Sequence, residues 1–526
     1  MDFNSIKFLF NTLKHLKFKQ IAYRVLYVLR NRFVNKEYSY ELKGSIEPLN
    51  WPNTIEQSTS YLGGLEFRFL NITHTFERKI DWNHDEFGKL WTYNLNYFDF
   101  LNQQCIEQTE ALILMKDYVA RTHELKDGLE PYPISLRGIN WIKYMSKENI
   151  KNEVINRYLY NQYLRLLDNL EYHLLGNHLL ENGFSLLFGA YYFKDDLLYS
   201  KAEKIIEEEL KEQILQDGAH FELSPMYHQI ILFRILDCIK LIKLNSWKNN
   251  YLLDFLEKKA SIMISWLREV TFKSGDIPNV NDSAINIAPT SNDLFNYADQ
   301  LGIIAKKLVL SDSGYRMFSN NKFELFVDVG NVGPSYQPGH VHSDTLSFIL
   351  HVNNKPFLVD TGVSTYEKNK IRQDERSTTS HNTVVIDGQD QTQVWGGFRV
   401  AKRAYITKIK EDVDFVEAEH DGYKSLGVKH SRKFIINKTS INISDNIINN
   451  SSYNQTAYFH FHPSIVKITI DDQSIIVGNN ITIVFTGTNV IMHEKLYDYA
   501  EEFNKIKKAI MVKVEFESNL ETSIKL

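Results

Sequence analysis

Apolar residues recur at helical spacing between about residues 95 and 310. In one stretch they fall at i, i+4, i+7, i+8, i+11 and i+15, namely Leu159, Tyr163, Leu166, Leu167, Leu170 and Leu174. Similar patterns cover residues 108–121, 185–194, 198–215, 226–243 and 252–268. These segments follow one another without a strand pattern between them, which excludes a βαβ sheet. The pattern predicts paired antiparallel helices in a bundle or toroid.

After residue 320 the apolar period drops to two, and the apolar runs are separated by Asn, Asp and Gly turns. The predicted strands cover residues 323–330, 345–352, 355–360, 382–387, 430–437, 440–447, 456–462 and 474–486. This pattern predicts a second domain made of antiparallel strands. We therefore divide the chain into a lead-in (1–85), a helical domain (86–315) and a β domain (316–526), as a length of 526 residues also suggests.

The lead-in begins with an unusually basic segment. Its first 36 residues contain a single acid, Asp2, and eight cationic residues interleaved with apolar ones, namely Lys7, Lys14, Lys17, Lys19, Arg24, Arg30, Arg32 and Lys36. Such a segment suits the surface of an anionic membrane. It suits somewhat better an amphipathic helix that packs on its own protein with a basic outer face. The sequence leaves both interpretations open.

Composition narrows the class of protein. The net charge of −5 and the pI of about 6.4 argue against nucleic acid as a partner. We find neither a secretory signal pattern nor a run of 18 apolar residues. The two cysteines, Cys105 and Cys238, imply no disulfide framework. We therefore expect a cytoplasmic protein, membrane-associated if the basic segment binds lipid; its oligomeric state is not indicated.

The stretch from Pro338 to Gly388 concentrates metal-binding and catalytic residue types. It contains a His-x-His pair (His340 and His342) before a predicted strand, Asp360 at the end of the next strand, and His381 at the start of a third. Residues i and i+2 of an extended segment face the same side. Imidazoles and a carboxylate are ligands that suit zinc.

Two stretches of the helical half are too polar for the helices that carry them. GNHLLENG closes a predicted helix with Asn177 and His178, and FELSPMYHQ places Glu222, Tyr227 and His228 around a Ser-Pro helix start. Side chains at helix ends project from the rim of a bundle into a cleft. A single His or Tyr there more often caps or packs than reacts.

Taken together, these motifs resemble a known family. HVHSD, FLVDTG and RSTTSHNTVVIDG, with NHLLENG and SPMYH upstream, are similar to the heparinase II/III family of polysaccharide lyases and to related alginate lyases and uronate epimerases. LWTYNLNYFDFL, PYPISLRGINWIKY and VWGGFRVAKRA extend the resemblance over roughly residues 85–410. The resemblance implies an incomplete (α/α) toroid followed by an antiparallel, sandwich-like β domain, with the active site between them.

The resemblance also implies roles for individual residues. It makes Tyr227 a general base or acid and His340 a catalytic histidine, while Asn177 and His178 neutralise the carboxylate of a uronic acid. The implied metal ligands, for a zinc ion that we expect to be structural, are His342, Asp360 and His381. Candidate substrate contacts are Arg137, Glu222, His228, Tyr366, Arg376 and Arg399.

The expected chemistry removes the weakly acidic carbon-5 proton of a 4-linked uronic acid and expels the oxygen on carbon 4. Donors that neutralise the carboxylate stabilise the enolate-like intermediate. We expect a lyase acting on an acidic polysaccharide, such as a glycosaminoglycan. Two alternatives use the same scaffold: a carbon-5 epimerase in capsule or surface-polysaccharide synthesis, and a glycan-binding protein without activity. Which uronate polymer is bound cannot be read from the sequence.

Overall fold

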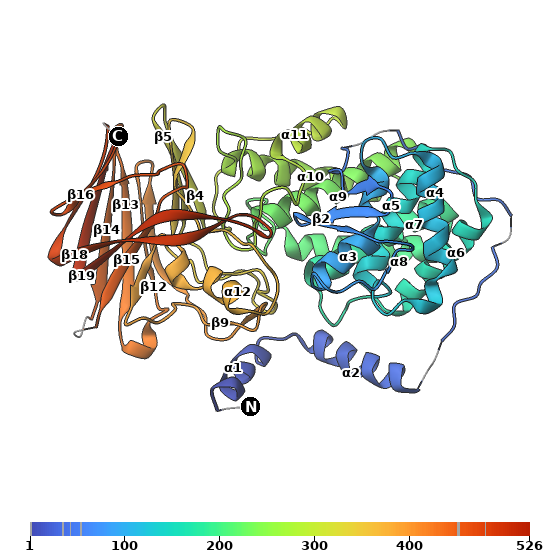
Figure 1. Ribbon diagram of the computed structural model, residues 1–526, viewed down its shortest axis with the longest axis horizontal. Helices are drawn as coiled ribbons and strands as arrows, with labels where there is room; N and C mark the ends of the chain where they lie inside the picture. The colour runs from blue at the N-terminus through green and yellow to red at the C-terminus, as the bar shows by residue number, and fades with distance from the viewer. Residues whose placement is uncertain (1–2, 34–35, 43, 53–54, 450–452, 479) are drawn as a thin grey trace.

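The computed structural model describes residues 3–526 except 34–35, 43, 53–54, 450–452 and 479, so Asp2 lies outside the described residues. A helical domain and a β domain lie side by side, and two N-terminal helices run along one edge of the molecule (Figure 1). Among the described residues no helix is both long and apolar enough to span a membrane.

The helical domain is built around α7, whose side chains are buried over nearly its whole length. A helix that is apolar on all sides is stable only in the interior, and α7 packs against α5, α8 and α9. The helices of this domain are α3 (Lys89–Tyr97), α4 (Gln108–Ala120), α5 (Pro131–Lys147), α6 (Glu153–Asp168), α7 (Gly176–Phe193), α8 (Asp196–Gln213), α9 (Pro225–Leu244), α10 (Tyr251–Val270) and α11 (Ser291–Gln300). The predicted helical toroid is confirmed.

The chain also contains a small sheet, one short α-helix and several 3₁₀ helices. A small sheet that the sequence analysis did not predict precedes α3 and contains β1 (Tyr61–Gly63), β2 (Glu66–Phe69) and β3 (Ile72–Thr75). One short α-helix, α12 (Lys370–Glu375), lies in the β domain. The 3₁₀ helices are η1 (Asp99–Asn102), η2 (Thr122–Glu124), η3 (Thr378–Ser380) and η4 (Lys424–Leu426).

The β domain pairs a four-stranded sheet with a larger one, all antiparallel. Phe348 of the small sheet packs against Phe434 of the large sheet, with ring centroids 5.7 Å apart, so the two inner faces share one core. The small sheet has the order β4 (Tyr315–Ser319), β5 (Phe323–Asp328), β6 (Phe348–Val352), β7 (Lys355–Leu358). The predicted antiparallel, sandwich-like domain is confirmed.

The large sheet has the order β11-β12-β13-β14-β19-β18-β17-β16, and β15 pairs with both β19 and β8. Its strands are β8 (Val384–Ile386), β11 (Ile406–Asp412), β12 (Phe415–His420), β13 (Lys429–Ile436), β14 (Ser440–Ile448), β15 (Gln455–His460), β16 (Thr469–Asp471), β17 (Ser474–Val477), β18 (Ile481–Glu502) and β19 (Lys505–Lys525). The predicted strand 474–486 is two strands, because the chain turns at Gly478, where φ is +60°. A separate hairpin contains β9 (Val394–Trp395) and β10 (Arg399–Val400).

Two groups of hydrogen bonds link segments that are distant in sequence near the boundary between the domains. The β18–β19 hairpin reaches across to the small sheet that precedes α3 (Figure 1), where Asn504 Nδ2 donates to the Leu70 carbonyl at 2.9 Å. At the junction itself, Asp217 Oδ2, from the loop after α8, accepts hydrogen bonds from the backbone of Ser311 and Ser313, each at 3.0 Å. Both contacts fix the cleft between the domains.

The N-terminal segment forms α1 (Phe3–Leu13) and α2 (Phe18–Phe33). α1 lies on the β9–β10 hairpin, where Trp395 Nε1 donates to Thr12 Oγ1 at 3.2 Å. α2 lies on the helical domain near the loop that precedes α7, where Gln20 Nε2 donates to the Leu174 carbonyl at 3.0 Å. The predicted basic, amphipathic segment is therefore helical and touches both domains.

Candidate active site

Tyr227 and His340 come from different domains and meet face to face. Their ring centroids are 4.0 Å apart and the rings are tilted by 33°. Tyr227 lies in the first turn of α9, because Pro225 starts the helix and the Ser224 hydroxyl caps it by accepting from the Tyr227 backbone N–H at 3.3 Å. This local Ser-Pro signal is the one that the sequence predicted. It aims the phenol into the cleft.

A buried carboxylate orients both histidines of the His-x-His pair. Asp282 Oδ2 lies 2.9 Å from His340 Nδ1, and Asp282 Oδ1 lies 2.9 Å from His342 Nε2. Each histidine uses one ring nitrogen in this way, so the Nε2 atom of His340 remains for chemistry in the cleft. The segment that carries the pair is irregular and not extended, but the two rings still converge on one group.

Arg372 of α12 neutralises that carboxylate. Its two terminal nitrogens lie 2.5 and 2.6 Å from the two oxygens of Asp282. Burial alone would raise the pKa of Asp282, but Arg372 and the two histidines hold it well below the usual value. The sequence analysis missed Asp282 and Arg372. Arg372 lies within the stretch from Pro338 to Gly388 but in none of its motifs, Asp282 lies outside that stretch, and only the fold joins them to His340.

Asn177 and Glu222 form a second pair on the helical side. Asn177 Nδ2 donates to Glu222 Oε2 at 2.9 Å, and the same oxygen lies 3.8 Å from His340 Nε2. Gly176 begins α7 with φ at +62°, and a Cβ atom there would lie 3.1 Å from Glu222 Oε1. Glycine is therefore needed for the close approach. Asn177 and His178 lie in the first turn of α7, whereas the sequence predicted that they would close the preceding helix.

His178 borders the same cleft. Its side chain is 40% exposed, and its Nδ1 lies 3.1 Å from Glu171 Oε1. Burial opposes the charged form, but Glu171 outweighs it and raises the pKa of His178. The centroid of the His178 ring lies 4.6 Å from that of the Tyr132 ring, and the Tyr132 and Tyr97 ring centroids are 6.1 Å apart. These two tyrosines extend an aromatic wall that the sequence analysis did not predict.

Tyr366 faces Tyr227 from the β domain. The two hydroxyl oxygens are 3.4 Å apart, and the Tyr366 ring packs against Phe398 at 5.2 Å. Burial is the main cause that raises the pKa of both phenols well above the usual value, and Asp282 and Glu222 add to it. The charges nearest to the two phenols are mainly negative, so both phenols are protonated at rest.

Several predicted substrate contacts are engaged within the protein. Arg137 donates to the carbonyls of Asn96 and Gly128, and Arg376 donates to those of Val341 and Gly397. Both guanidinium groups are buried, so they hold backbone segments.

Two further candidates also lie off the reacting centre. His228 is buried, with Nδ1 accepting from the His220 N–H and Nε2 at 3.0 Å from the Met263 carbonyl. Arg399 is exposed and lies over the Trp395 ring at 4.8 Å.

The three predicted metal ligands lie close together and are buried. His381 Nδ1 lies 2.7 Å from Asp360 Oδ2, and the rings of His342 and His381 are 5.4 Å apart. The remaining nitrogens, His342 Nδ1 and His381 Nε2, have no hydrogen-bond partner among the residues that the structure describes. Burial lowers the pKa of His342 to about 4, which keeps that imidazole neutral. Within the described ranges, however, no three acidic, histidine or cysteine side chains are arranged to hold a metal ion.

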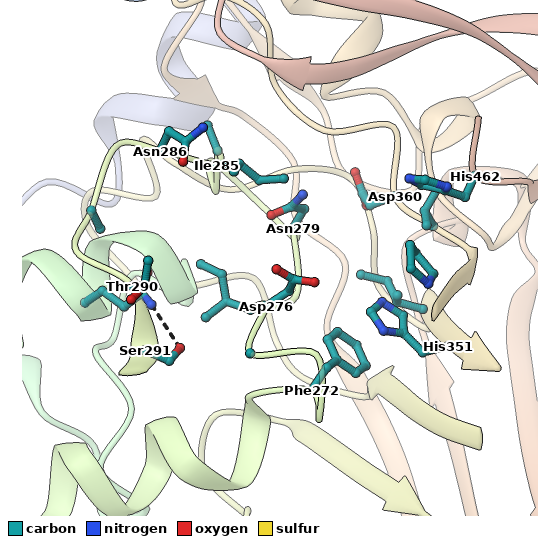
Figure 2. A pocket seen from close by; sticks show the side chains of 18 of the residues that line it. Phe272, Asp276, Asn279, Ile285, Asn286, Thr290, Ser291, His351, Asp360 and His462 are labelled. Carbon is teal, nitrogen blue, oxygen red and sulfur yellow. Dashed lines mark hydrogen bonds between the residues drawn. The ribbon is translucent and has the colours of Figure 1, made fainter. Parts of the chain in front are cut away.

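A cavity of about 280 Å³ lies beside Asp360 (Figure 2). Asp360 forms part of its wall, together with Asp276, His462 and His351, whose ring stacks on Phe272 at 3.8 Å. The residues that line it do not include Tyr227, His340 or Asn177, so it is separate from the cleft that holds the candidate catalytic groups.

Comparisons with known proteins agree with this architecture. The heparinase II/III N-terminus profile matches residues 133–301, and the heparinase II/III-like C-terminal profile matches residues 306–525. Heparin-sulfate lyase of Bacteroides stercoris is 24% identical over 341 residues, which cover 58% of this chain and 49% of the relative. The corresponding protein of Bacteroides thetaiotaomicron is 26% identical over 296 residues, covering 47% and 40%. The matched part thus spans about half or less of these relatives.

Solved structures show the same fold. Heparinase III has a TM-score of 0.67 at 16% identity, with 86% of this chain and 80% of the other covered. A heparan sulfate lyase HepC mutant from Pedobacter heparinus has a TM-score of 0.59 at 17% identity, with 88% and 81% covered. Since the two profiles match both domains in order, the chain belongs to the heparinase II/III family.

Proposed function

We propose that the protein is a lyase that cleaves a uronate-containing polysaccharide by β-elimination. The observation that carries this proposal is the 4.0 Å approach of Tyr227 to His340 across the boundary between the domains. A phenol and an imidazole at one point can handle the two protons of an elimination. Family membership supports the same chemistry, and the matched relatives are heparin-sulfate lyases.

The first requirement is to neutralise the substrate carboxylate. Asn177 uses one amide hydrogen on Glu222, and its second hydrogen is available to the substrate. His178, with its pKa raised by Glu171, supplies a cationic donor at the rim of the cleft. Preorganised donors of this kind stabilise the negative charge that develops as the carbon-5 proton leaves.

The second requirement is proton transfer. In our proposal His340 Nε2 removes the carbon-5 proton, since Asp282 holds its Nδ1. The Tyr227 phenol, protonated at rest because of its raised pKa, donates its proton to the oxygen on carbon 4. The carbon–oxygen bond breaks, a double bond forms between carbons 4 and 5, and the Tyr366 hydroxyl stabilises the phenolate that remains. Each acid or base group contributes about a hundred- to ten-thousandfold in rate.

We also propose that a zinc ion, when bound, would be held by the free nitrogens of His342 and His381, with Asp360 beside them. The two buried nitrogens without partners among the described residues support this, and the lowered pKa of His342 keeps that imidazole neutral, as a zinc ligand must be. Such an ion would supply positive charge that stabilises the β domain. His342 shares Asp282 with His340, so the same loop orients the proposed base.

The substrate class follows from the relatives. We propose a glycosaminoglycan-type polymer, with heparan sulfate as the first substrate to test and hyaluronan, alginate and bacterial capsular uronates beside it. The cleft offers aromatic surfaces for sugar rings at Tyr132 and Phe398, and Phe398 is 43% exposed.

The test is to incubate the protein with each polymer and follow near-ultraviolet absorbance of the unsaturated product. We expect absorbance to rise with the wild-type protein. In Tyr227→Phe, the rate of this rise should be lower by at least about a hundredfold. Tyr251→Phe, on the exposed start of α10, is the matched control. Deuterium uptake at carbon 5 without cleavage would show epimerisation instead. Unchanged rates in Tyr227→Phe would overturn the proposed acid.

A further inference from the structure

The helix α2 packs on the protein with its polar and aromatic side. Gln20 is buried and its amide donates to the Leu174 carbonyl at 3.0 Å. The Tyr27 hydroxyl donates to the Leu170 carbonyl at 2.5 Å, and Arg30 donates to the Asp168 carbonyl at the end of α6 and to Asn169 Oδ1 just after it. Hydrogen bonds and aromatic contacts therefore hold this helix on the protein.

The apolar side of α2 points to solvent. In an α-helix successive residues are rotated by 100°, so the apolar residues of α2 lie on the side of the helix opposite Gln20 and Tyr27. Its members and their exposed fractions are Phe18 84%, Ile21 47%, Val25 54%, Leu26 52%, Val28 64%, Leu29 51% and Phe33 76%. In α1, Phe10 and Leu13 are 69% and 45% exposed. Proteins rarely expose a continuous apolar patch of this kind unless a partner covers it. The alternative interpretation holds in that α2 packs on its own protein, but the outer face is mainly apolar, with Arg24 and Arg32 as its exposed cations.

The positive charge of the N-terminal segment indicates which kind of surface its apolar face binds. From residue 3 to residue 36 the sequence contains no acid, whereas the whole chain carries −5. Arg24, Arg32 and Lys14 are exposed along the same helices. An in-plane helix with an apolar face and cationic flanks is typical of proteins that bind anionic lipid surfaces.

We propose that α1 and α2 form a docking arm that lies in the interface of an anionic lipid bilayer. The apolar face of α2 enters the acyl boundary, and Arg24 and Arg32 contact headgroup phosphates. One flat surface can contact both helices, which follow each other along one edge of the molecule (Figure 1). The inference goes beyond the proposed lyase activity and does not depend on it.

Docking there would bring the membrane close to the cleft. α1 holds the β9–β10 hairpin through Thr12, which accepts from Trp395 and donates to the Val400 carbonyl at 3.2 Å. The tip of that hairpin carries Phe398, whose ring lies 6.0 Å from that of His340. Lipid binding therefore places the rim of the candidate active site near the bilayer.

Vesicle flotation with the full chain tests the proposal. We expect binding to vesicles of phosphatidylglycerol and phosphatidylethanolamine, and about tenfold less binding after Val25→Glu with Leu29→Glu. Arg24→Glu with Arg32→Glu, or added salt, should also lower binding severalfold. The control is Val413→Glu with Val466→Glu, at sites 91% and 86% exposed on the β domain, which should bind as wild type does.

Three results would overturn the proposal. One is wild-type protein that does not float with any vesicle, and another is equal binding of wild type and the Val25→Glu, Leu29→Glu variant. The third is a wild-type dimer in sedimentation that the same variant converts to monomer without any lipid binding, which would assign the apolar face to a second copy of the chain. Thermal unfolding should match wild type in every variant, because the altered side chains are exposed.

Discussion

Asp282 is the single group on which both residues of the His-x-His pair converge. It accepts from His340 and His342, and Arg372 compensates its charge. Each residue of the His-x-His pair has a different second task. His340 presents Nε2 to the cleft beside Tyr227, whereas the free nitrogen of His342 is buried near His381. Two residues apart in sequence, they should respond differently to substitution.

We expect His340→Ala to abolish activity with little change in melting temperature, because its side chain borders the cleft. We expect His342→Ala to lower both activity and melting temperature, since that ring is fully buried and bonded to Asp282. A chelator should lower the melting temperature of wild type and of His340→Ala, but leave that of His342→Ala unchanged. Equal losses of melting temperature in both variants would contradict this division of roles.

At the scale of elements, the large sheet contains a buried charge cluster that no motif indicated. Arg432 of β13 and Asp445 of β14 are paired across the two strands, and Arg432 Nε lies 2.7 Å from Asp445 Oδ1. His430 Nε2 lies 2.7 Å from the same oxygen. Burial would raise the pKa of Asp445, but Arg432 and His430 lower it to about 2. The cluster fixes the register of the two strands.

This cluster predicts a loss of stability in acid. The pKa of Asp445 is about 2 in the folded state and about 4 in an unfolded chain, so the pair stabilises the fold above pH 4 by about 2–3 kcal/mol. That contribution decreases as the pH falls from 4 towards 2. The free energy of unfolding, measured with denaturant, should fall between pH 6 and pH 3. This fall should be about 1 kcal/mol smaller in Asp445→Asn than in wild type. The same pH dependence in both would contradict the assignment.

At the scale of the whole molecule, the cleft exists only because the two domains are held at a fixed angle. Asp217 holds the segment that leads into the β domain: its Oδ2 accepts from the backbone N–H groups of Ser311 and Ser313 and from the Ser313 hydroxyl at 2.7 Å. Close by, the Tyr315 hydroxyl donates to the Leu223 carbonyl at 2.5 Å, immediately before the helix that carries Tyr227. The junction therefore supports the position of Tyr227 relative to His340.

Asp217→Ala should lower the free energy of unfolding by about 3 kcal/mol, because three hydrogen bonds to a buried carboxylate are lost. Activity should fall as well, since the distance between Tyr227 and His340 is no longer fixed. Asp312→Ala, an exposed neighbour on the same turn, is the control and should behave as wild type in unfolding and in activity. Retained stability in Asp217→Ala would show that other contacts fix the domains.

The sequence by itself determined the order of the two domains and the local position of Tyr227. Apolar periodicity reports which face of each element is buried, and a Ser-Pro start fixes a helix terminus through interactions a few residues apart. Only the tertiary structure decided that Asp282 and Arg372 serve His340, because Asp282 lies 58 residues before His340 and Arg372 lies 32 residues after it. It also decided that α2 turns its apolar face outward, because the helical pattern is the same whichever side attaches to the protein.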